Sequence, residues 1–333
     1  MNYIEKEKLE RLRHTFDQNY RLTHLYSSYL QNFPEIITKE MIDELTRGTD
    51  IGKEEAIAAL ISEIFGLDDS RTDDRRLIRD YIRPSVKLLD AKRYTSNKYY
   101  KNIKIENTKI GAWELKWESY PPYRAVICDD IKINSDYSEI APLGFFDEEF
   151  FFPAVLEDGN EWMTLTPVDL DTSDEAIEKA HGRVVTFGLG LGYYAFMVSE
   201  KEEVESITVV EKSEDVIKLF SEYILPQFTH PEKVKIVSDD AFSYAEKIMP
   251  KMNYDFAFVD TWRDASDGAP MYARMKRLEH YSPKTEFSYW IENFLISRLR
   301  AEKFEALYNL VANDSDDAPV TYEEFLERLN YNG

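Results

Sequence analysis

The sequence contains very few of the residues that form disulfide bonds or bind metal ions. Among its 333 residues there is one cysteine, Cys128. No disulfide can therefore form within the chain, and no cysteine cluster can hold a metal. The five histidines show no spacing typical of a metal site. We expect a core held together by packing alone, and no bound metal.

Long apolar runs are also missing. No stretch approaches the roughly 18–20 consecutive apolar residues of a transmembrane helix, and the N-terminal segment MNYIEKEKLERLRHTF is charged, unlike a signal peptide. The sequence therefore predicts a cytoplasmic protein without membrane contact. Hydrophobic residues still make up 43% of the chain and aromatic residues 14%, which is ample for a packed core.

Basic residues are scarce in most of the chain. The net charge is −22, and residues 1–100 are nearly balanced, with 17 Lys and Arg against 18 Asp and Glu. The remaining residues hold 24 against 45. Because proteins that bind nucleic acid need a basic surface to offset phosphates, duplex nucleic acid is not expected as a partner. An acidic field suits a small molecule, an amine or a basic protein segment.

Hydrophobic patterning divides the chain into three parts. Residues 1–97 have apolar side chains at helical spacing and predict a helical N-terminal region, which leaves open a homo-oligomer formed through it. Residues 98–170 alternate in strand fashion and predict a β-rich segment or lid. Residues 171–333 predict an α/β domain with a helical C-terminus.

Local signals refine this division. Asp74 to Arg93 predicts a long helix, with a kink or break at Pro84 because proline lacks the backbone N–H. Tyr99 to Ile105 predicts a strand. Asp158-Gly159, between two apolar runs, predicts a tight β-hairpin. Thr172 and Glu175 have the spacing of a capping box at a helix start.

Arginines gather at one place in the N-terminal region, at positions Arg71, Arg75, Arg76, Arg79 and Arg83. Two interpretations remain open. The stripe is either a solvated face that forms ion pairs with nearby acids, or an anion site for a carboxylate or phosphate on a substrate.

Three alternating glycines mark the most informative segment, which is residues 184–192 (VVTFGLGLG). A β-branched strand runs directly into Gly188, Gly190 and Gly192. Only glycine combines positive φ with the absence of a side chain, so this loop can turn sharply and let another group approach its backbone closely.

A carboxylate follows at the end of the next apolar run. Glu211 closes residues 206–211 (SITVVE), 19 residues beyond Gly192, where a βαβ nucleotide fold binds ribose hydroxyls. The dinucleotide pattern G-x-G-x-x-G would require glycine at Tyr193, but the chain has G-x-G-x-G from Gly188. These signals together indicate a nucleoside-containing cofactor.

The compact glycine pattern resembles motif I of the class I S-adenosylmethionine-dependent methyltransferases. The resemblance extends over residues 172–292, because residues 234–241 (VKIVSDDA) and 254–260 (YDFAFVD) are similar to that family's third and fourth strands. It implies that Asp240 and Ala241 bracket the adenine, and that Asp260 faces the methionine end of the cofactor or the substrate.

The resemblance also implies a fold and a full set of cofactor-binding residues. The fold is a Rossmann-like α/β sheet of strand order 3-2-1-4-5, which either stops at five strands or is completed by strands from residues 98–170. Thr186 stands where the family usually has an acidic residue, and its hydroxyl can bond the loop or the methionine amino group. The implied cofactor site comprises Thr186, Gly188, Gly190, Gly192, Glu211, Asp240, Ala241 and Asp260.

Methyl transfer from a sulfonium is an in-line displacement, in which the enzyme aligns the acceptor and removes its proton. Asp260, with Asp264 nearby, is the predicted catalytic group. The leading hypothesis is a methyltransferase that uses S-adenosyl-L-methionine and acts on a small-molecule or protein acceptor.

Two other functions stay open. Spermidine synthases share this sheet and bind an amine with acidic residues after strand four, so the chain could be an aminopropyltransferase. Their Asp-x-x-Asp would here be Asp260 to Asp264, which is one residue longer, and Arg263 between them would repel an amine. The third hypothesis is a non-catalytic module that binds S-adenosylmethionine and serves in assembly.

Overall fold

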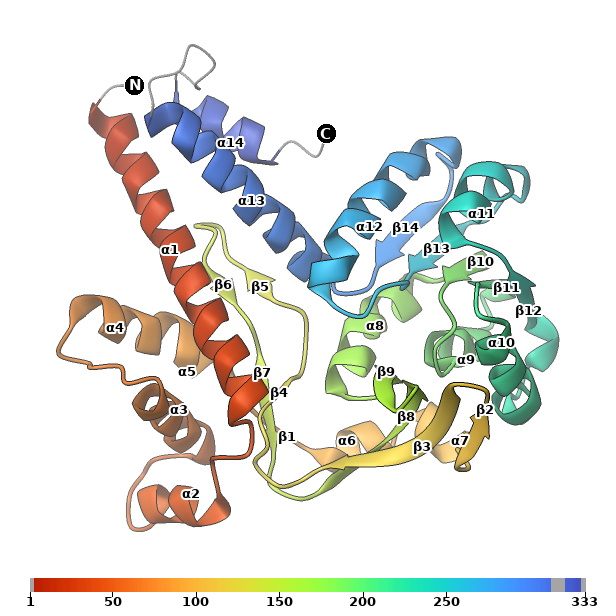
Figure 1. Ribbon diagram of the computed structural model, residues 1–333, viewed down its shortest axis with the longest axis horizontal. Coiled ribbons are helices and arrows are strands. Elements are labelled where there is room, and N and C mark those ends of the chain that lie inside the picture. Colours follow the sequence, from red (N-terminus) through yellow and green to blue (C-terminus); the bar gives the residue numbers. More distant parts are fainter. Residues whose placement is uncertain (1–2, 313–320, 331–333) are drawn as a thin grey trace. The chain divides into compact units, whose positions relative to one another are not determined.

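The computed structural model describes residues 3–312 and 321–330 and divides into two compact units (Figure 1). Unit 1 is built from residues 1–88, 130–145 and 293–333, and unit 2 from residues 89–129 and 146–292. Both units are therefore assembled from separated segments of the chain. The predicted boundaries at residues 97 and 170 do not coincide with the ends of these units.

Unit 1 is mainly helical, as the patterning of its first segment predicts. Its 30-residue helix α1 packs against α13 and α14 through an apolar cluster in which the Phe16 and Phe304 rings stack, with centroids 4.0 Å apart. Its helices and short strands are α1 (Tyr3–Asn32), α2 (Lys39–Thr46), α3 (Lys53–Ile64), α4 (Thr72–Leu77), η1 (Ile78–Ile82), α5 (Arg83–Ser85), β1 (Val86–Leu89), β5 (Lys132–Ile133), β6 (Glu139–Ile140), β7 (Leu143–Phe146), α13 (Glu292–Ala312) and α14 (Tyr322–Asn330).

The long helix predicted from Asp74 to Arg93 is wrong beyond Pro84. Helix α4 passes into the π-helical turn η1 and then into the single turn α5, where Pro84 occupies one of the first positions. Because proline cannot donate the backbone hydrogen bond of a continuing helix, the break falls at the predicted place. The chain then becomes strand β1, whose residues Val86–Leu89 are apolar apart from Lys87.

Unit 2 contains a five-stranded parallel sheet of order β12-β11-β10-β13-β14, with helices α8 to α12 around it (Figure 1). Numbered along the chain, this is the order 3-2-1-4-5, so the predicted Rossmann-like topology is confirmed. Its strands and flanking helices are α8 (Pro167–Lys179), β10 (Gly182–Phe187), α9 (Tyr193–Ser199), β11 (Val204–Glu211), α10 (Glu214–Leu219), η2 (Phe220–Ile224), η3 (Leu225–Gln227), η4 (Pro231–Lys233), β12 (Val234–Ser238), α11 (Ala241–Lys247), η5 (Met249–Lys251), β13 (Phe256–Val259), α12 (Ala265–Leu278), η6 (Glu279–Tyr281) and β14 (Glu286–Tyr289).

The two central strands explain why this segment forms a parallel sheet. All four residues of β13 are buried, and so are Val184 to Phe187 of β10, because helices cover both faces of such a sheet. The register pairs Val184 with Phe256 and Phe187 with Val259. Within the described chain the sheet stops at five strands, so the strands from residues 98–170 do not complete it.

Those upstream strands instead form an antiparallel sheet of order β2-β3-β8-β9. The predicted hairpin is confirmed, since β8 and β9 turn at Asp158 (φ 51°) and Gly159 (φ 81°), the pair of positive φ values that a two-residue turn requires. The predicted strand Tyr99–Ile105 is wrong, because Asn97 caps a short helix there. The remaining elements of unit 2 are α6 (Ala91–Thr95), α7 (Lys98–Asn102), β2 (Thr108–Ile110), β3 (Trp113–Tyr120), β4 (Val126–Ile127), β8 (Phe150–Glu157) and β9 (Asn160–Thr164).

Helix α8 begins five residues before the predicted capping box at Thr172. Thr166 is its N-cap, and Asp169 at the third helical position accepts hydrogen bonds from the Thr166 N–H (2.8 Å) and hydroxyl (2.7 Å). Thr172 lies inside the helix, where its hydroxyl donates to the Val168 carbonyl. Pro167 at the first turn suits this start, because its missing N–H would be unpaired there in any case.

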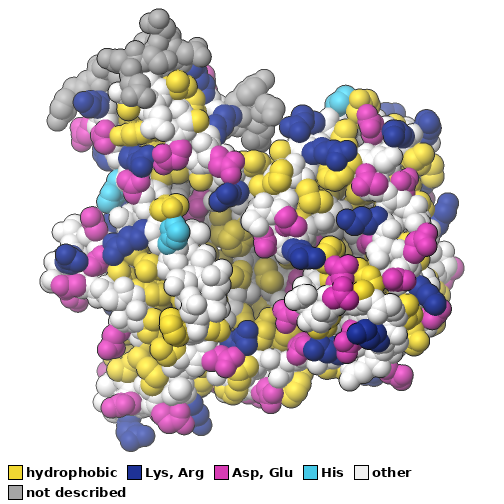
Figure 2. Space-filling view, in the orientation of Figure 1, with side chains coloured by type: hydrophobic (Ala, Val, Ile, Leu, Met, Phe, Trp, Pro, Cys, Tyr) yellow, Lys and Arg dark blue, Asp and Glu magenta, His cyan; other side chains and the backbone are white. Residues whose placement is uncertain are grey.

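On the face of the molecule in Figure 2, acidic and basic side chains are interspersed over the surface. In the part of the chain that the structure describes, no helix combines the length and apolar character needed to cross a membrane.

Candidate functional site

A cleft of about 280 Å³ lies in unit 2 at the ends of its parallel strands. Open α/β sheets bind ligands outside the carboxyl ends of their strands, at the point where the strand order reverses. Here that point lies between β10 and β13. The cleft is lined by the loop after β10, the ends of β11, β12 and β13, and the β9 strand of the antiparallel sheet.

The glycine loop after β10 has the backbone conformation that its sequence predicts. Gly188, Gly190 and Gly192 have φ values of 96°, 47° and 71°. A Cβ atom at Gly188 would collide with the backbone carbonyl of Asp260, and one at Gly192 with the Phe220 ring. The glycines therefore allow both the left-handed turn and close packing against neighbouring segments.

Met163, on β9, is a site residue that sequence reasoning missed. Its Sδ accepts a hydrogen bond from the Leu191 N–H (3.2 Å) and occupies the space that a Cβ at Gly190 would enter. The side chain that approaches Gly190 is thus the protein's own thioether. No local signal marks Met163, because its role depends on the hairpin folding against the glycine loop.

Glu211 lies at the end of β11 and lines the cleft, as predicted for a ribose-binding residue. It also organises the surrounding backbone, since its two oxygens accept hydrogen bonds from the N–H groups of Leu189 (3.2 Å) and Ser213 (2.8 Å). An ionised carboxylate has about four acceptor positions. Glu211 therefore retains capacity for ribose hydroxyls while it fixes the glycine loop.

Asp240 and Ala241 also line the cleft, beyond the end of β12. Asp240 is the N-cap of α11, and its Oδ1 accepts a hydrogen bond from the Ser243 N–H (2.9 Å). Capping occupies only part of its acceptor capacity. The structure thus brings the predicted adenine-binding pair to the same cleft as Glu211.

Asp260 follows β13 directly and lines the cleft from the opposite side of the switch point. No described residue donates a hydrogen bond to its carboxylate. Its surroundings raise the pKa of Asp260 to about 8, first because burial disfavours the charged form and then because the carboxylates of Asp169 and Glu211 repel it. A carboxyl group with a pKa near neutrality is suited to act as a general base.

A smaller inner cavity of about 20 Å³ adjoins the cleft, and Asp169, Gly188 and Asp260 line both spaces. Thr186 and Tyr194 line the inner cavity only. The pKa of Asp169 is raised to about 6 because its burial outweighs the hydrogen bonds from Thr166. Thr186, predicted as a cofactor ligand, is buried at this inner end rather than exposed in the cleft.

The second predicted catalytic residue, Asp264, does not line either cavity. It is the N-cap of α12, where its Oδ1 accepts hydrogen bonds from the Ser266 N–H (2.7 Å) and hydroxyl (2.6 Å). Asp267 completes a reciprocal capping box by accepting from the Asp264 N–H. Asp260 therefore lies at the site as predicted, whereas the side chain of Asp264 caps the start of α12.

Arg263 lines the cleft, but its charge is already partnered. Its guanidinium lies over the Trp162 ring, 4.4 Å from the centroid, and 3.5 Å from a Glu157 carboxylate oxygen. Besides Lys212, no other basic side chain lines the two cavities among the described residues. The described residues also contain no group of three or more His, Cys, Asp or Glu side chains arranged to hold a metal.

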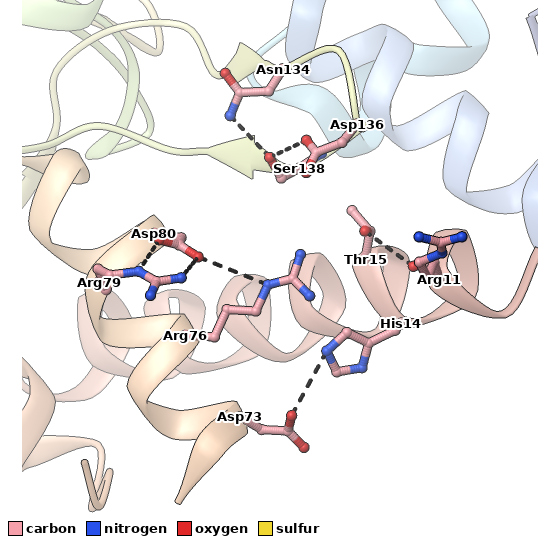
Figure 3. Close-up of polar contacts among 10 residues, drawn as sticks. All are labelled: Arg11, His14, Thr15, Asp73, Arg76, Arg79, Asp80, Asn134, Asp136 and Ser138. Carbon is pink, nitrogen blue, oxygen red and sulfur yellow. Dashed lines mark hydrogen bonds and ion pairs between the residues drawn. The ribbon is translucent and has the colours of Figure 1, made fainter. Parts of the chain in front are cut away.

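Arginines of the stripe in unit 1 form ion pairs with nearby acidic side chains (Figure 3). Arg79 forms two hydrogen bonds with Asp80 (2.6 and 2.7 Å), and Arg76 lies 3.9 Å from the same carboxylate. Arg83 pairs with Glu55 at 3.5 Å. These contacts support the interpretation of the stripe as a solvated face with ion pairs rather than an anion site.

No protein family model matches the sequence, and no curated protein is significantly similar to it. The solved structures that resemble the chain include two spermidine synthases. One is a spermidine synthase in complex with the transition-state analogue AdoDATO, at 16% identity and a TM-score of 0.32, with 55% of this chain and 61% of that chain covered. The other is the spermidine synthase from Thermotoga maritima, at 13% identity and a TM-score of 0.33, with 60% and 71% covered. The assignment of the Rossmann-like fold rests on the strand order.

Proposed function

We propose that unit 2 binds an S-adenosylmethionine-type cofactor in the cleft and transfers a group from its sulfonium to a small-molecule or protein acceptor. The observation that carries this proposal is the arrangement of Glu211, the Asp240–Ala241 pair and Asp260 at the ends of three parallel strands, around one glycine loop. The G-x-G-x-G pattern lacks the third glycine of the dinucleotide pattern G-x-G-x-x-G, which favours a cofactor without a pyrophosphate.

The cofactor would be held by residues with different tasks. Glu211 would accept hydrogen bonds from the ribose hydroxyls, and Asp240 from the adenine amino group. The glycine loop, held by hydrogen bonds to Glu211 and Met163, would line the cleft beside the adenosyl group. When bound, such a cofactor supplies an electrophilic carbon next to a positively charged sulfur.

Asp260 would remove the proton from the acceptor. A sulfonium transfers its group by in-line displacement, so the acceptor needs a free electron pair directed at the carbon. With its raised pKa, Asp260 is a stronger base than an exposed aspartate and still ionises near neutral pH. We propose methyl transfer from S-adenosyl-L-methionine as the main activity.

Aminopropyl transfer is the second candidate, and the charge of the site favours it specifically. A methionine carboxylate would meet Asp169 and Asp260 in the inner cavity, where no described lining residue is Lys, Arg or His. An aminopropyl chain ends in an ammonium group that suits these acids. Arg263 does not oppose this, because it is paired with Glu157. Binding of intact against decarboxylated S-adenosylmethionine decides between the two activities.

The test of the cofactor site is Glu211→Gln, followed by titration calorimetry with 5′-methylthioadenosine, which has the ribose and adenine common to both cofactors. Glutamine keeps one carbonyl acceptor for the loop but loses the charge, so the affinity should fall by about 1.5–3 kcal/mol. The matched control is Glu203→Gln, since Glu203 is an exposed carboxylate of unit 2 outside the cleft. Unchanged affinity in Glu211→Gln, or no binding by the wild type, overturns the proposal.

Turnover of labelled cofactor then separates an enzyme from a non-catalytic binding module. A wild-type protein that binds the cofactor but transfers no label to any amine, hydroxyl or protein acceptor is a binding module.

A further inference from the structure

The inner cavity beside the cleft has an unusual charge environment. Two carboxyl side chains, Asp169 and Asp260, line a space of about 20 Å³, and none of the described residues that line it is Lys, Arg or His. Ionised carboxylates are costly away from water unless a cation or hydrogen-bond donors accompany them. The described residues that line this cavity therefore do not by themselves balance the charge of two ionised carboxylates.

A third polar group in the same cavity lacks a partner. Tyr194 is 7% exposed and lines the cavity, and its hydroxyl is buried without a hydrogen-bond partner among the described residues. Buried hydroxyl groups in native proteins are almost always hydrogen-bonded. The Tyr194 ring is fixed by stacking on Phe258, with centroids 4.3 Å apart, so the hydroxyl cannot readily turn elsewhere.

The size of the cavity limits what can fill it. A volume of about 20 Å³ accommodates one water-sized group. An ammonium group has this size, carries a positive charge and offers three hydrogen-bond donors. Two carboxylates and a hydroxyl oxygen are three acceptors. A carboxylate or phosphate would bring further negative charge and more volume.

We propose that this inner cavity is an ammonium-binding subsite formed by Asp169, Asp260 and Tyr194, and that Asp169 makes the site specific for ligands with a primary amine. The proposal rests on the proposed function, because the cavity adjoins the cleft at Gly188 and Leu189, next to the loop against which the cofactor would lie. The amine belongs either to the chain on the cofactor sulfur or to the acceptor.

Asp169 is suited to this role by its position in the fold. The capping box at the start of α8 fixes its side chain, because the Thr166 N–H and hydroxyl both donate to Oδ2. The Thr164 side chain also hydrogen-bonds this carboxyl group. Because an ionised carboxylate has about four acceptor positions, Asp169 retains capacity for an ammonium group. Asp169 lies on α8, which carries neither the glycine loop nor the carboxylates at the strand ends. It therefore contributes to ligand specificity separately from those residues.

Titration calorimetry with three probes tests the subsite. The probes are 5′-methylthioadenosine, which has no amine, decarboxylated S-adenosylhomocysteine, which has an amine alone, and 1,4-diaminobutane added to protein saturated with methylthioadenosine. Asp169→Asn should weaken an amine-bearing probe about tenfold, the effect of one charge-assisted hydrogen bond, and leave methylthioadenosine within about twofold. Loss confined to the decarboxylated probe assigns the amine to the cofactor, and loss confined to the diamine assigns it to the acceptor.

The matched control is Asp171→Asn. Asp171 lies on the same helix and also has a pKa raised to about 6 by burial, but it pairs with Arg93 and lines neither cavity. This variant should bind all three probes as the wild type does. Asparagine at position 169 retains a carbonyl acceptor for the cap, and far-UV circular dichroism checks that α8 stays folded. Tyr194→Phe, which removes only the hydroxyl, should weaken the same amine-bearing probe by a smaller factor.

Proton release gives a readout that a merely structural role would not change. Near pH 7 an amine that enters the cavity should expel a proton from the carboxyl pair, so the binding enthalpy should depend on the ionisation enthalpy of the buffer, whereas that of methylthioadenosine should not. Equal losses for all probes in Asp169→Asn, or none, overturn the subsite. If the wild type binds no adenosyl probe, the proposed function fails, and titration with the diamine alone then decides the subsite separately.

Discussion

Asp74 in unit 1 and Asp260 in unit 2 are both shielded from solvent by surrounding protein, yet their pKa values shift in opposite directions. Asp74 accepts a hydrogen bond from the Asp68 N–H (3.1 Å) and lies 2.7 Å from the Arg21 guanidinium, and these partners hold its pKa below its usual range. Among the described residues, none donates a hydrogen bond to Asp260 or forms an ion pair with it, and its pKa rises to about 8. The negative charge of Asp74 is thus balanced by neighbouring groups of the protein. The carboxylate of Asp260 instead lines the cleft, where a ligand could balance it.

The same contrast extends to the two units as a whole. In unit 1 several acids form ion pairs with basic side chains, as in the Arg13–Glu305 and Arg79–Asp80 pairs. At the strand ends of unit 2 the acids face a cavity instead. Since burying a charge without a partner is costly, such an arrangement is retained where it serves binding or catalysis.

The largest expected effect is on turnover. Asp260→Asn keeps the volume of the side chain but removes its charge and its ability to accept a proton, so kcat should fall roughly 10²–10⁴-fold while the affinity for amine-free 5′-methylthioadenosine stays close to that of the wild type. The measurement uses labelled cofactor and an acceptor found by screening amines against the wild type. If cofactor binding weakens and turnover at saturation is normal, Asp260 is a cofactor ligand. The difference between Asp260 and Asp74 then does not reflect catalysis.

The next effect is on the pH dependence of stability. The folded pKa of Asp260 is about 8 and its ordinary value is 3.8. Between these values the folded state keeps a proton that the unfolded state has lost, so stability should fall as pH rises. Asp260→Asn removes this dependence, and its advantage over the wild type should grow by roughly 1.4 kcal/mol per pH unit across this window.

Urea unfolding at pH 5, 6, 7 and 8, followed by tryptophan fluorescence, measures this difference. All five tryptophans lie in unit 2, so the signal reports that unit. A stability difference that stays constant with pH would show that Asp260 ionises normally.

The smallest effect belongs to Asp74. Asp74→Asn should destabilise unit 1 by about 2 kcal/mol at pH 7, because a charged acceptor for Arg21 and the Asp68 N–H is lost. This penalty should shrink as pH falls below the ordinary pKa of aspartate, since the wild-type carboxylate is then protonated in the unfolded state. Far-UV circular dichroism should shift and the tryptophan transition should not. If Asp74→Asn instead stabilises unit 1, the charge of Asp74 is not balanced by its neighbours, as for Asp260.

Several features of the site follow from local sequence signals. The glycines after β10, and Glu211 at the end of the next strand, were predictable because positive φ and strand termination depend on a few adjacent residues. The hairpin at Asp158-Gly159 was predictable for the same reason. Asp264 was predicted as catalytic from its proximity in sequence to Asp260, but its side chain is used to cap α12.

Asp169 and Met163 could not be assigned to the site from their own neighbours in sequence. Thr166-Pro167-Val168-Asp169 carries a local signal for the start of α8, because proline follows a capping threonine, but Thr172 and Glu175 have the spacing of a capping box as well. Even the correct helix start would not have shown that Asp169 lines the same cavity as Asp260. That proximity joins residues 91 positions apart in the sequence.

The sequence by itself indicated the buried strands, the glycine loop and the strand-end carboxylates, because these are encoded within short segments, and the resemblance to class I methyltransferases implied the strand order. Only the tertiary structure decided how separated segments combine into two units, and that the β8–β9 hairpin places Met163 against the glycine loop. It also decided which acids have partners and which face a cavity. The physical reason is that a charge's pKa and function depend on the groups that folding brings around it, and these come from distant parts of the chain.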